Sequence, residues 1–222
     1  MVYKIMKGNT FIFFEALLIT LVLLSVGFSI GLYFESFRTS KVIQGYKNFE
    51  VEALDLKLQN YYFQTLNKGN CMVALEENIN FADRLYDEGL IIQKYEDINQ
   101  ITEELLLEKK RYVLLKTELW LNSIILKERC KEPFHTVIYL YSNTPGQAKE
   151  AEQEAISNVL KDIKEKKGNQ VILIPIAGDM ELRAIDLQMK IYNITYLPSI
   201  LIDEKYVLEG FHNTEEIEKY LK

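Results

Sequence analysis

The sequence predicts an α/β domain that follows an N-terminal membrane helix and a helical hairpin. Three observations lead to this prediction. Short β-branched and aromatic runs alternate with helical segments in the C-terminal part. A long uncharged run lies near the N-terminus, and apolar residues recur at helical spacing between these two regions. We therefore expect three parts, a membrane anchor over 1–35, a helical stalk over 36–133 and an α/β domain over 134–222.

The uncharged run is long enough to cross a bilayer. The 19 residues from Ala16 to Phe34 carry no charge, and as a helix they span about 28 Å at 1.5 Å per residue. A cleaved signal peptide has a shorter apolar region and a small-x-small site, which Gly31 to Phe34 does not offer. We expect an uncleaved single-pass anchor, and Gly27 and Gly31 have the spacing of a helix–helix contact, so a homodimer is a further possibility.

The stalk is predicted as three helices. A heptad-like stripe runs through Thr39 to Asn67, with Val42, Tyr46, Phe49, Ala53, Leu56 and Phe63 on one side. A second helix is expected from Cys71 to about Tyr95 and a third from about Ile101 to Cys130. We expect the ionic residues of the third helix, among them Lys127, on its exposed side. The last two helices should form an antiparallel hairpin.

The hairpin predicts that the chain's two cysteines are neighbours. Cys71 begins one helix and Cys130 ends the next, with the turn midway between them. A disulfide there closes a loop of about 60 residues and contributes roughly 4 kcal/mol in the chain-entropy model. A disulfide also implies an oxidising compartment. That places the residues after the anchor outside the cytoplasm, and Lys4 and Lys7 on the cytoplasmic side agree with this orientation.

The C-terminal part alternates strands and helices. Strands are predicted at Thr136–Tyr141, Val171–Ile176, Ser199–Ile202 and Tyr206–Leu208, and helices at Gln147–Lys167 and Met180–Tyr192. The last two strands are separated by three polar residues and should form an antiparallel hairpin. Asn213 with Glu216 predicts a capping box for a last helix that runs to Leu221.

This order of elements, together with Leu197-Pro198 before an apolar strand, resembles the thioredoxin-like fold over roughly residues 134–222. The resemblance implies that Pro198 is cis, and that the surface beside it takes an extended peptide through the backbone of Leu197. Thioredoxins carry Cys-x-x-Cys between the first strand and the first helix, where a helix N-terminus stabilises thiolate. Here that stretch is Thr144-Pro145-Gly146-Gln147-Ala148-Lys149, which has no cysteine.

The expected function is therefore protein or peptide binding, in folding or assembly, at a redox-inactive surface. The residues of this surface are Thr144, Pro145, Gly146, Gln147, Leu197 and Pro198. Two alternatives remain open, an envelope thiol-disulfide oxidoreductase that uses Cys71 and Cys130 or a partner's thiols, and a structural stalk that dimerises through the membrane helix. With two histidines and two cysteines and a net charge of −6, we expect no metal, no cofactor and no nucleic-acid partner.

Overall fold

The structure is a computed structural model that describes residues 13–33, 51, 54–55, 57–58, 61, 71–98, 103–130 and 134–221. Two compact units are present, one over residues Met1–Lys47 and one over residues Asn48–Lys222. The expected stripe residues from Val42 to Phe63 lie outside the described residues. Within the same predicted helix, the ammonium of Lys57 lies 3.6 Å from the Glu118 carboxylate of the hairpin described below.

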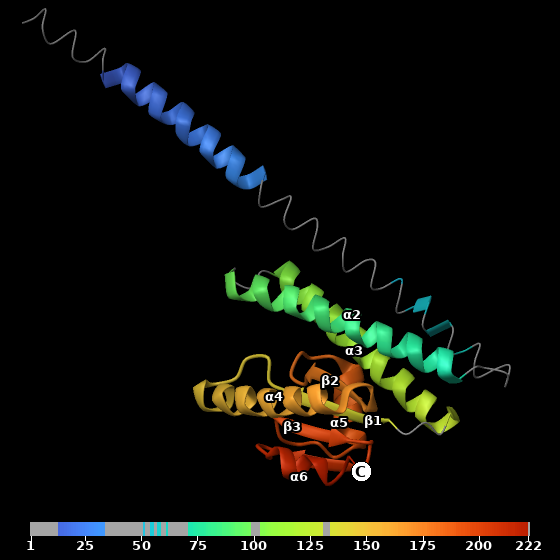
Figure 1. The fold of residues 1–222 in the computed structure, drawn as a ribbon. Helices are drawn as coiled ribbons and strands as arrows, with labels where there is room; N and C mark the ends of the chain where they lie inside the picture. The colour runs from blue at the N-terminus through green and yellow to red at the C-terminus, as the bar shows by residue number, and fades with distance from the viewer. Residues whose placement is uncertain are drawn as a thin grey trace, which may run out of the picture. The chain divides into compact units, whose positions relative to one another are not determined.

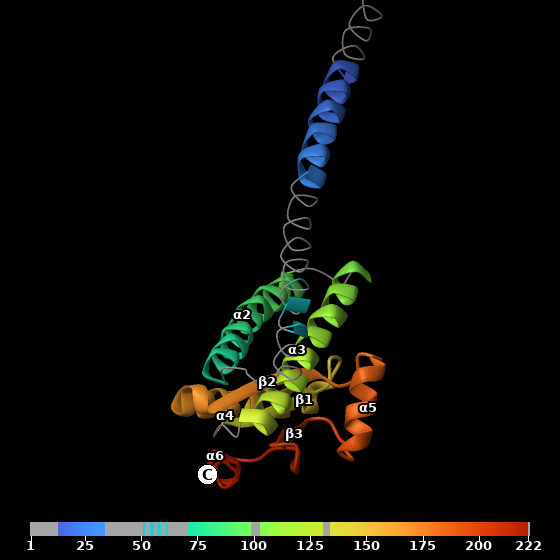
Figure 2. The ribbon, with the colours of Figure 1, turned by 90° about the vertical axis from the view of Figure 1, so that its right-hand side faces the viewer.

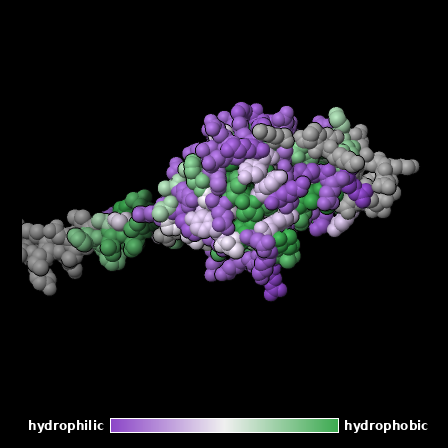
Figure 3. Space-filling model, turned by 90° about the horizontal axis from the view of Figure 1, so that it is seen from below, coloured by the Kyte–Doolittle hydropathy of each residue, from purple (hydrophilic) through white to green (hydrophobic). Residues whose placement is uncertain are grey.

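Among the described residues of the first unit, the helix Phe13–Tyr33 is long and apolar enough to cross a membrane. Its mean hydropathy reaches 2.2 over 18 residues, and none of that window is buried against the protein. Figure 3 shows it as hydrophobic, whereas the face of the second unit in the same view is mostly hydrophilic. Length and composition fit a membrane anchor, and a signal sequence at the N-terminus passes the same test.

The hairpin consists of α2 (Cys71–Ile98) and α3 (Glu103–Cys130), which pack against each other. A disulfide joins Cys71 to Cys130, with their Cα atoms 5.6 Å apart. The two cysteines are thus neighbours, as predicted. Buried polar groups also link the helices, because the Asn78 amide donates to the Ser123 hydroxyl at 2.9 Å.

The remainder of the second unit is built on a four-stranded sheet in the order β2-β1-β3-β4 (Figure 1). The strands are β1 (His135–Tyr141), β2 (Val171–Ala177), β3 (Ser199–Ile202) and β4 (Tyr206–Glu209). Strand β1 pairs parallel with β2 and antiparallel with β3, and β3 pairs antiparallel with β4. The parallel pair requires a crossover, and the helix α4 (Gln147–Lys167) provides it. The predicted order of strands and helices is the order observed.

Helices cover both faces of this sheet, and in Figure 2 α4 and α5 (Arg183–Ile191) lie on opposite sides of the strands. One face packs against α4 and α6 (Thr214–Glu218) through a cluster that includes Val137, Tyr139, Ile156 and Ile217. Side chains alternate along a strand, so fully buried Ile138 and Leu140 point to the other face. There α3 contacts β1, β2 and α5.

The sheet therefore depends on α3 for part of its core. Trp120 and Leu126 of α3 are buried, and the Trp120 ring lies 5.7 Å from that of Tyr192. The boundary between a stalk that ends at residue 133 and a domain that begins at residue 134 stays a prediction. In the structure the hairpin and the sheet belong to one compact unit. We refer to residues 71–98, 103–130 and 134–221 together as the head.

Several element ends differ from the predictions for local reasons. Helix α5 begins at Arg183 rather than Met180, because Glu181 has a positive φ of 56° that interrupts a right-handed helix. The last helix is shorter than predicted and ends at Glu218. Its capping box is present: the Asn213 side chain accepts from the Glu216 N–H at 3.0 Å, and the Glu216 carboxylate accepts from the Asn213 N–H at 3.2 Å.

Lys127 does not lie on the exposed side of α3. Its ammonium donates to Asp203 at 2.6 Å, to Glu204 at 3.3 Å and to the Thr136 hydroxyl at 2.9 Å. Trp120 Nε1 also donates to Glu204, at 2.9 Å. These five residues form a polar cluster between α3, the start of β1 and the β3–β4 turn, and we call it the anchor cluster. It fixes the turn, in which Asp203 and Glu204 both have the uncommon positive φ.

Candidate functional site

The structure brings the Thr144–Gln147 turn and the Leu197–Pro198 loop together at one end of the sheet. Strand register pairs Leu140 with Ser199, so the turn that follows β1 and the loop that precedes β3 leave the sheet side by side. Side chains also join them, since the Tyr196 hydroxyl donates to Glu152 of α4 at 3.3 Å and the Lys149 ammonium lies 4.9 Å from the centre of the Tyr196 ring. We call the surface formed by residues 142–147 and 195–198 the corner.

Polar side chains fix the first segment of the corner. The Asp179 carboxylate accepts from the Ser142 hydroxyl at 2.5 Å and from the Asn143 N–H at 2.7 Å. Gln153 exchanges two hydrogen bonds with the Ser142 backbone, at 2.8 and 3.2 Å. Because Asp179 follows β2 and Gln153 belongs to α4, the turn is held from both sides.

The second segment of the corner is held by backbone hydrogen bonds and by close packing. The Leu197–Pro198 peptide bond is cis. The Pro198 carbonyl accepts from the Gly210 N–H at 2.9 Å, and the Ser199 hydroxyl donates to the Tyr196 carbonyl at 2.6 Å. A Cβ atom at Gly178 would lie 3.0 Å from both methyl groups of Leu197, so glycine allows this loop to approach the end of β2.

The predicted surface residues differ in exposure. Thr144, Gly146 and Gln147 are exposed, Pro145 and Leu197 are partly buried, and Pro198 is buried. Gly146 is the N-cap of α4, and the Glu150 N–H donates to its carbonyl at 2.9 Å. The first residue of α4 is therefore an exposed, neutral glutamine, Gln147. Its chemistry suits hydrogen bonding to a peptide and offers no nucleophile for thiol exchange.

Both cysteines lie far from the corner. Cys130 ends α3 shortly before β1 begins, whereas Pro198 lies next to the last residues of β1. The seven residues of β1 lie between the two positions, and they span about 20 Å at 3.3 Å per residue. The disulfide is therefore at the opposite end of the sheet from the corner. Among the described residues no group of His, Cys, Asp and Glu side chains is arranged to hold a metal ion.

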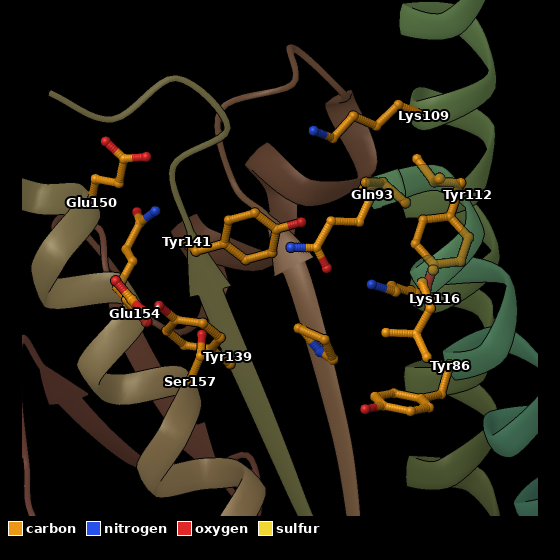
Figure 4. Close-up of a pocket in the computed structure, with 16 residues that line it drawn as sticks. Tyr86, Gln93, Lys109, Tyr112, Lys116, Tyr139, Tyr141, Glu150, Glu154 and Ser157 are labelled. Atoms are coloured by element: carbon orange, nitrogen blue, oxygen red, sulfur yellow. Dashed lines mark hydrogen bonds between the residues drawn. The ribbon is translucent and has the colours of Figure 1, made fainter. Parts of the chain in front are cut away.

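A pocket of about 440 Å³ that was not predicted from the sequence lies between the hairpin and the sheet. Figure 4 shows Tyr86, Gln93, Lys109, Tyr112 and Lys116 of the hairpin on one wall, and Glu150, Glu154 and Ser157 of α4 on the other. Tyr139 and Tyr141 of β1 lie between the walls. The available signal was a lysine, Lys116, inside an otherwise largely apolar stretch of α3.

Lys116 is the distinctive group of this pocket. The residue is 8% exposed, and burial, followed by the nearby charge of Lys109, lowers its pKa to about 7. Its ammonium lies 4.2 Å from the centre of the Tyr112 ring. Burial also raises the pKa of Tyr139 to about 12, and the Tyr139 hydroxyl donates to the Gln153 carbonyl at 3.1 Å.

Comparison with known proteins gives little sequence similarity. No family model matches the chain. No curated protein sequence matches it either. Among solved structures, the chain is similar to chloroplastic thioredoxin z, whose structure was described as defining a type-specific target recognition. The identity is 18% and the TM-score 0.33, over 41% of this chain and 79% of that chain. The roles described here rest on the strand order, hydrogen bonds and burial of this chain itself.

Proposed function

We propose that this chain is a membrane-anchored, extracytoplasmic thioredoxin-like protein whose corner binds a protein or peptide client without thiol chemistry. One observation carries the proposal. The two cysteines of the chain are bonded to each other at the end of the sheet remote from Pro198, while the turn from Ser142 to Gln147 contains none. Disulfide exchange requires a thiolate that attacks the substrate, and the corner has no residue that could supply one.

The topology part of the proposal rests on the helix and the disulfide together. The helix Phe13–Tyr33 has the length and hydropathy of a single membrane span. A structural disulfide is typical of oxidising compartments, so the head is assigned to the extracytoplasmic side. Lys4 and Lys7 on the other flank then lie in the cytoplasm, in keeping with the positive-inside rule.

The binding part rests on the geometry of the corner. Hydrogen bonds from Gly210 and Ser199 hold the Leu197–Pro198 loop. Hydrogen bonds to Asp179 and Gln153 hold the facing turn. Two preorganised segments beside exposed Thr144 and Gln147 can accept an extended backbone without first being ordered. We assign Leu197 the role of offering its backbone to the client.

A pair of tryptophan substitutions tests this assignment. Gln147 and Gln170 are both exposed glutamines, and Gln147 begins α4 at the corner whereas Gln170 lies beyond the other end of α4. The full chain in detergent micelles is applied to an array of extended peptides in which every cysteine is replaced by serine. Because a tryptophan at the corner blocks the surface sterically, Gln147→Trp should weaken binding at least tenfold, and Gln170→Trp should leave it unchanged. If no peptide is retained, or if both variants bind as the original chain does, the proposal is wrong.

A further inference from the structure

We propose that the pocket between the hairpin and the sheet is a binding site for a small organic monocarboxylate with an aromatic or apolar body, and that Lys116 is the counter-ion of its carboxylate. This site is distinct from the corner and does not depend on the function proposed for it. Its volume of about 440 Å³ falls within the roughly 300–1,000 Å³ typical of small-molecule sites.

First, the pocket contains a lysine side chain, that of Lys116, which forms no ion pair with any described residue. Among the described residues, Lys116 Nζ makes no hydrogen bond or ion pair, and it lies over the face of the Tyr112 ring. A buried ammonium in this situation is unfavourable unless a counter-charge compensates it. In Figure 4 the ammonium points from α3 toward the strands, into the pocket. A bound carboxylate would supply the missing counter-charge.

The second step is that the wall beneath this cation is preorganised. The Tyr112 hydroxyl donates to the Leu85 carbonyl of α2 at 2.7 Å, which fixes the ring under Lys116. This contact requires glycine at position 89, because a Cβ there would overlap the Tyr112 hydroxyl. A site whose side chains are held in place loses less entropy when a ligand binds. The hairpin therefore holds the Tyr112 ring beneath Lys116 in place.

The third step concerns the kind of anion. The opposite wall carries Glu150 and Glu154 of α4, which would repel a second negative group on the same ligand. Tyr139 and Tyr141 lie between the two walls and offer ring surface to an aromatic or apolar body (Figure 4). Pro175 of β2 adds a further apolar surface. A monoanion with a ring or an alkyl body fits these walls better than a phosphate or a dicarboxylate.

A matched pair of ligands tests the proposal on the full chain in detergent micelles. N-acetylphenylalanine carries the carboxylate, and N-acetylphenylalaninamide has the same body without the charge. Isothermal titration calorimetry at pH 6.5 should give an affinity at least tenfold higher for the acid. A tetrapeptide with a free C-terminal phenylalanine distinguishes the source of the carboxylate, since tighter binding than the single residue assigns a peptide terminus and weaker binding assigns a small acid.

The affinity for the acid should also depend on pH in one direction. Lys116 is charged below its pKa of about 7, so the affinity should fall about tenfold for each pH unit above 7. The titratable groups that face Lys116 are Tyr86 of α2, Lys109 and Tyr112 of α3, Tyr139 and Tyr141 of β1, and Glu150 and Glu154 of α4. The amide meets the same groups, so its pH profile is the control for them.

Two variants complete the test. Lys116→Met keeps the volume of the side chain and removes the charge, and it should abolish the preference for acid over amide. Lys161→Met removes an exposed lysine of α4 whose side chain is 64% exposed, and it should leave both affinities unchanged. Equal binding of acid and amide, binding of neither, or an unaltered preference in Lys116→Met would overturn the proposal. If Lys116→Met does not fold, the ligand pair and the pH profile of the original chain still decide it.

Discussion

The two ends of the sheet in the head are held in different ways. At the end where β1 begins, the Cys71–Cys130 disulfide ties α2 to α3 covalently, and the anchor cluster ties α3 to the sheet through ion pairs. At the end where β1 finishes, the corner is held by hydrogen bonds from Asp179 and Gln153 and by the packing of Leu197 on Gly178. The comparison indicates that the strongest ties in the head are remote from the exposed loops of the corner.

Among the substitutions that test this difference between the two ends, removal of the disulfide should lower the free energy of unfolding most. Cys130→Ser opens a loop defined by a sequence separation of 59 residues, and the chain-entropy model gives a loss of roughly 4 kcal/mol in the free energy of unfolding. Urea denaturation of the full chain in micelles, followed by tryptophan fluorescence, measures this loss because Trp120 is buried on α3. A loss below about 1 kcal/mol would mean that the disulfide does not hold this end of the head.

Loss of the ion pairs at the same end should rank second. Lys127→Met leaves the Asp203 and Glu204 carboxylates partly buried without their cation, and we expect a loss of about 2 kcal/mol, between the values for exposed and buried pairs. The matched control is Lys161→Met, whose pair with Glu165 is exposed on both sides and should contribute less than about 0.5 kcal/mol. Equal effects of the two substitutions would contradict the role of the anchor cluster.

The same cluster predicts a pH dependence with a definite sign. Burial raises the pKa of Asp203, but hydrogen bonds from Lys127 and His135 and the charge of Lys127 outweigh it, and the pKa lies below its usual value of 3.8. A lowered pKa in the folded state contributes stability above the ordinary value that is lost as the pH falls through the lowered one. The original chain should therefore lose stability below about pH 4, and in Lys127→Met this loss should be smaller, because the pKa of Asp203 is then less depressed. Chemical denaturation at a series of pH values measures both curves.

A substitution that changes the corner by packing should have a smaller effect on stability. Gly178→Ala places a methyl group 3.0 Å from the Leu197 methyl groups, and overpacking of this kind costs typically 1–3 kcal/mol. We expect a value near the lower limit, about 1 kcal/mol, because Leu197 is partly exposed and can move. Displacement of Leu197 should reduce the free energy of peptide binding by more than it reduces the free energy of unfolding. Unchanged peptide binding would mean that the Leu197 loop does not belong to the binding surface.

The smallest expected effect belongs to a polar substitution at the corner. Asp179→Asn keeps the size of the side chain but weakens the hydrogen bonds to Ser142 and Asn143, which are exposed to solvent. The expected loss is about 0.5 kcal/mol in the free energy of unfolding, the lower limit for a hydrogen bond, because both bonds are exposed. Compared with Lys127→Met under the same conditions, it should be the milder change. A larger loss than in Lys127→Met would reverse the order of the two ends.

Features that depend on local pattern were predicted well from the sequence. The strands, the crossover helix and the capping box at Asn213 follow from periodicity and from single residues. The pairing of Cys71 with Cys130 followed from the equal lengths of two helices joined by a short turn. These inferences need only the order of elements and not the details of their packing.

Features that depend on which surfaces meet were not predicted. Helix α3 buries side chains on more than one side, because α2 and the sheet both pack against it. Its buried polar residues, including Thr117 and Asn122, hide this wide contact from a search for one apolar stripe. The pocket and the position of Lys127 follow from the same contact. The membrane topology, the homodimer through Gly27 and Gly31 and the client of the corner stay predictions.

The central claim is that the head works without thiol chemistry, and a turnover assay tests it most directly. The full chain in micelles is incubated with a fluorescent disulfide substrate and dithiothreitol, beside the Cys71→Ala/Cys130→Ala double variant and a sample without protein. We predict the same rate in all three, because the corner has no cysteine and the disulfide lies at the opposite end of β1. Turnover above the background that disappears in the double variant would contradict the claim.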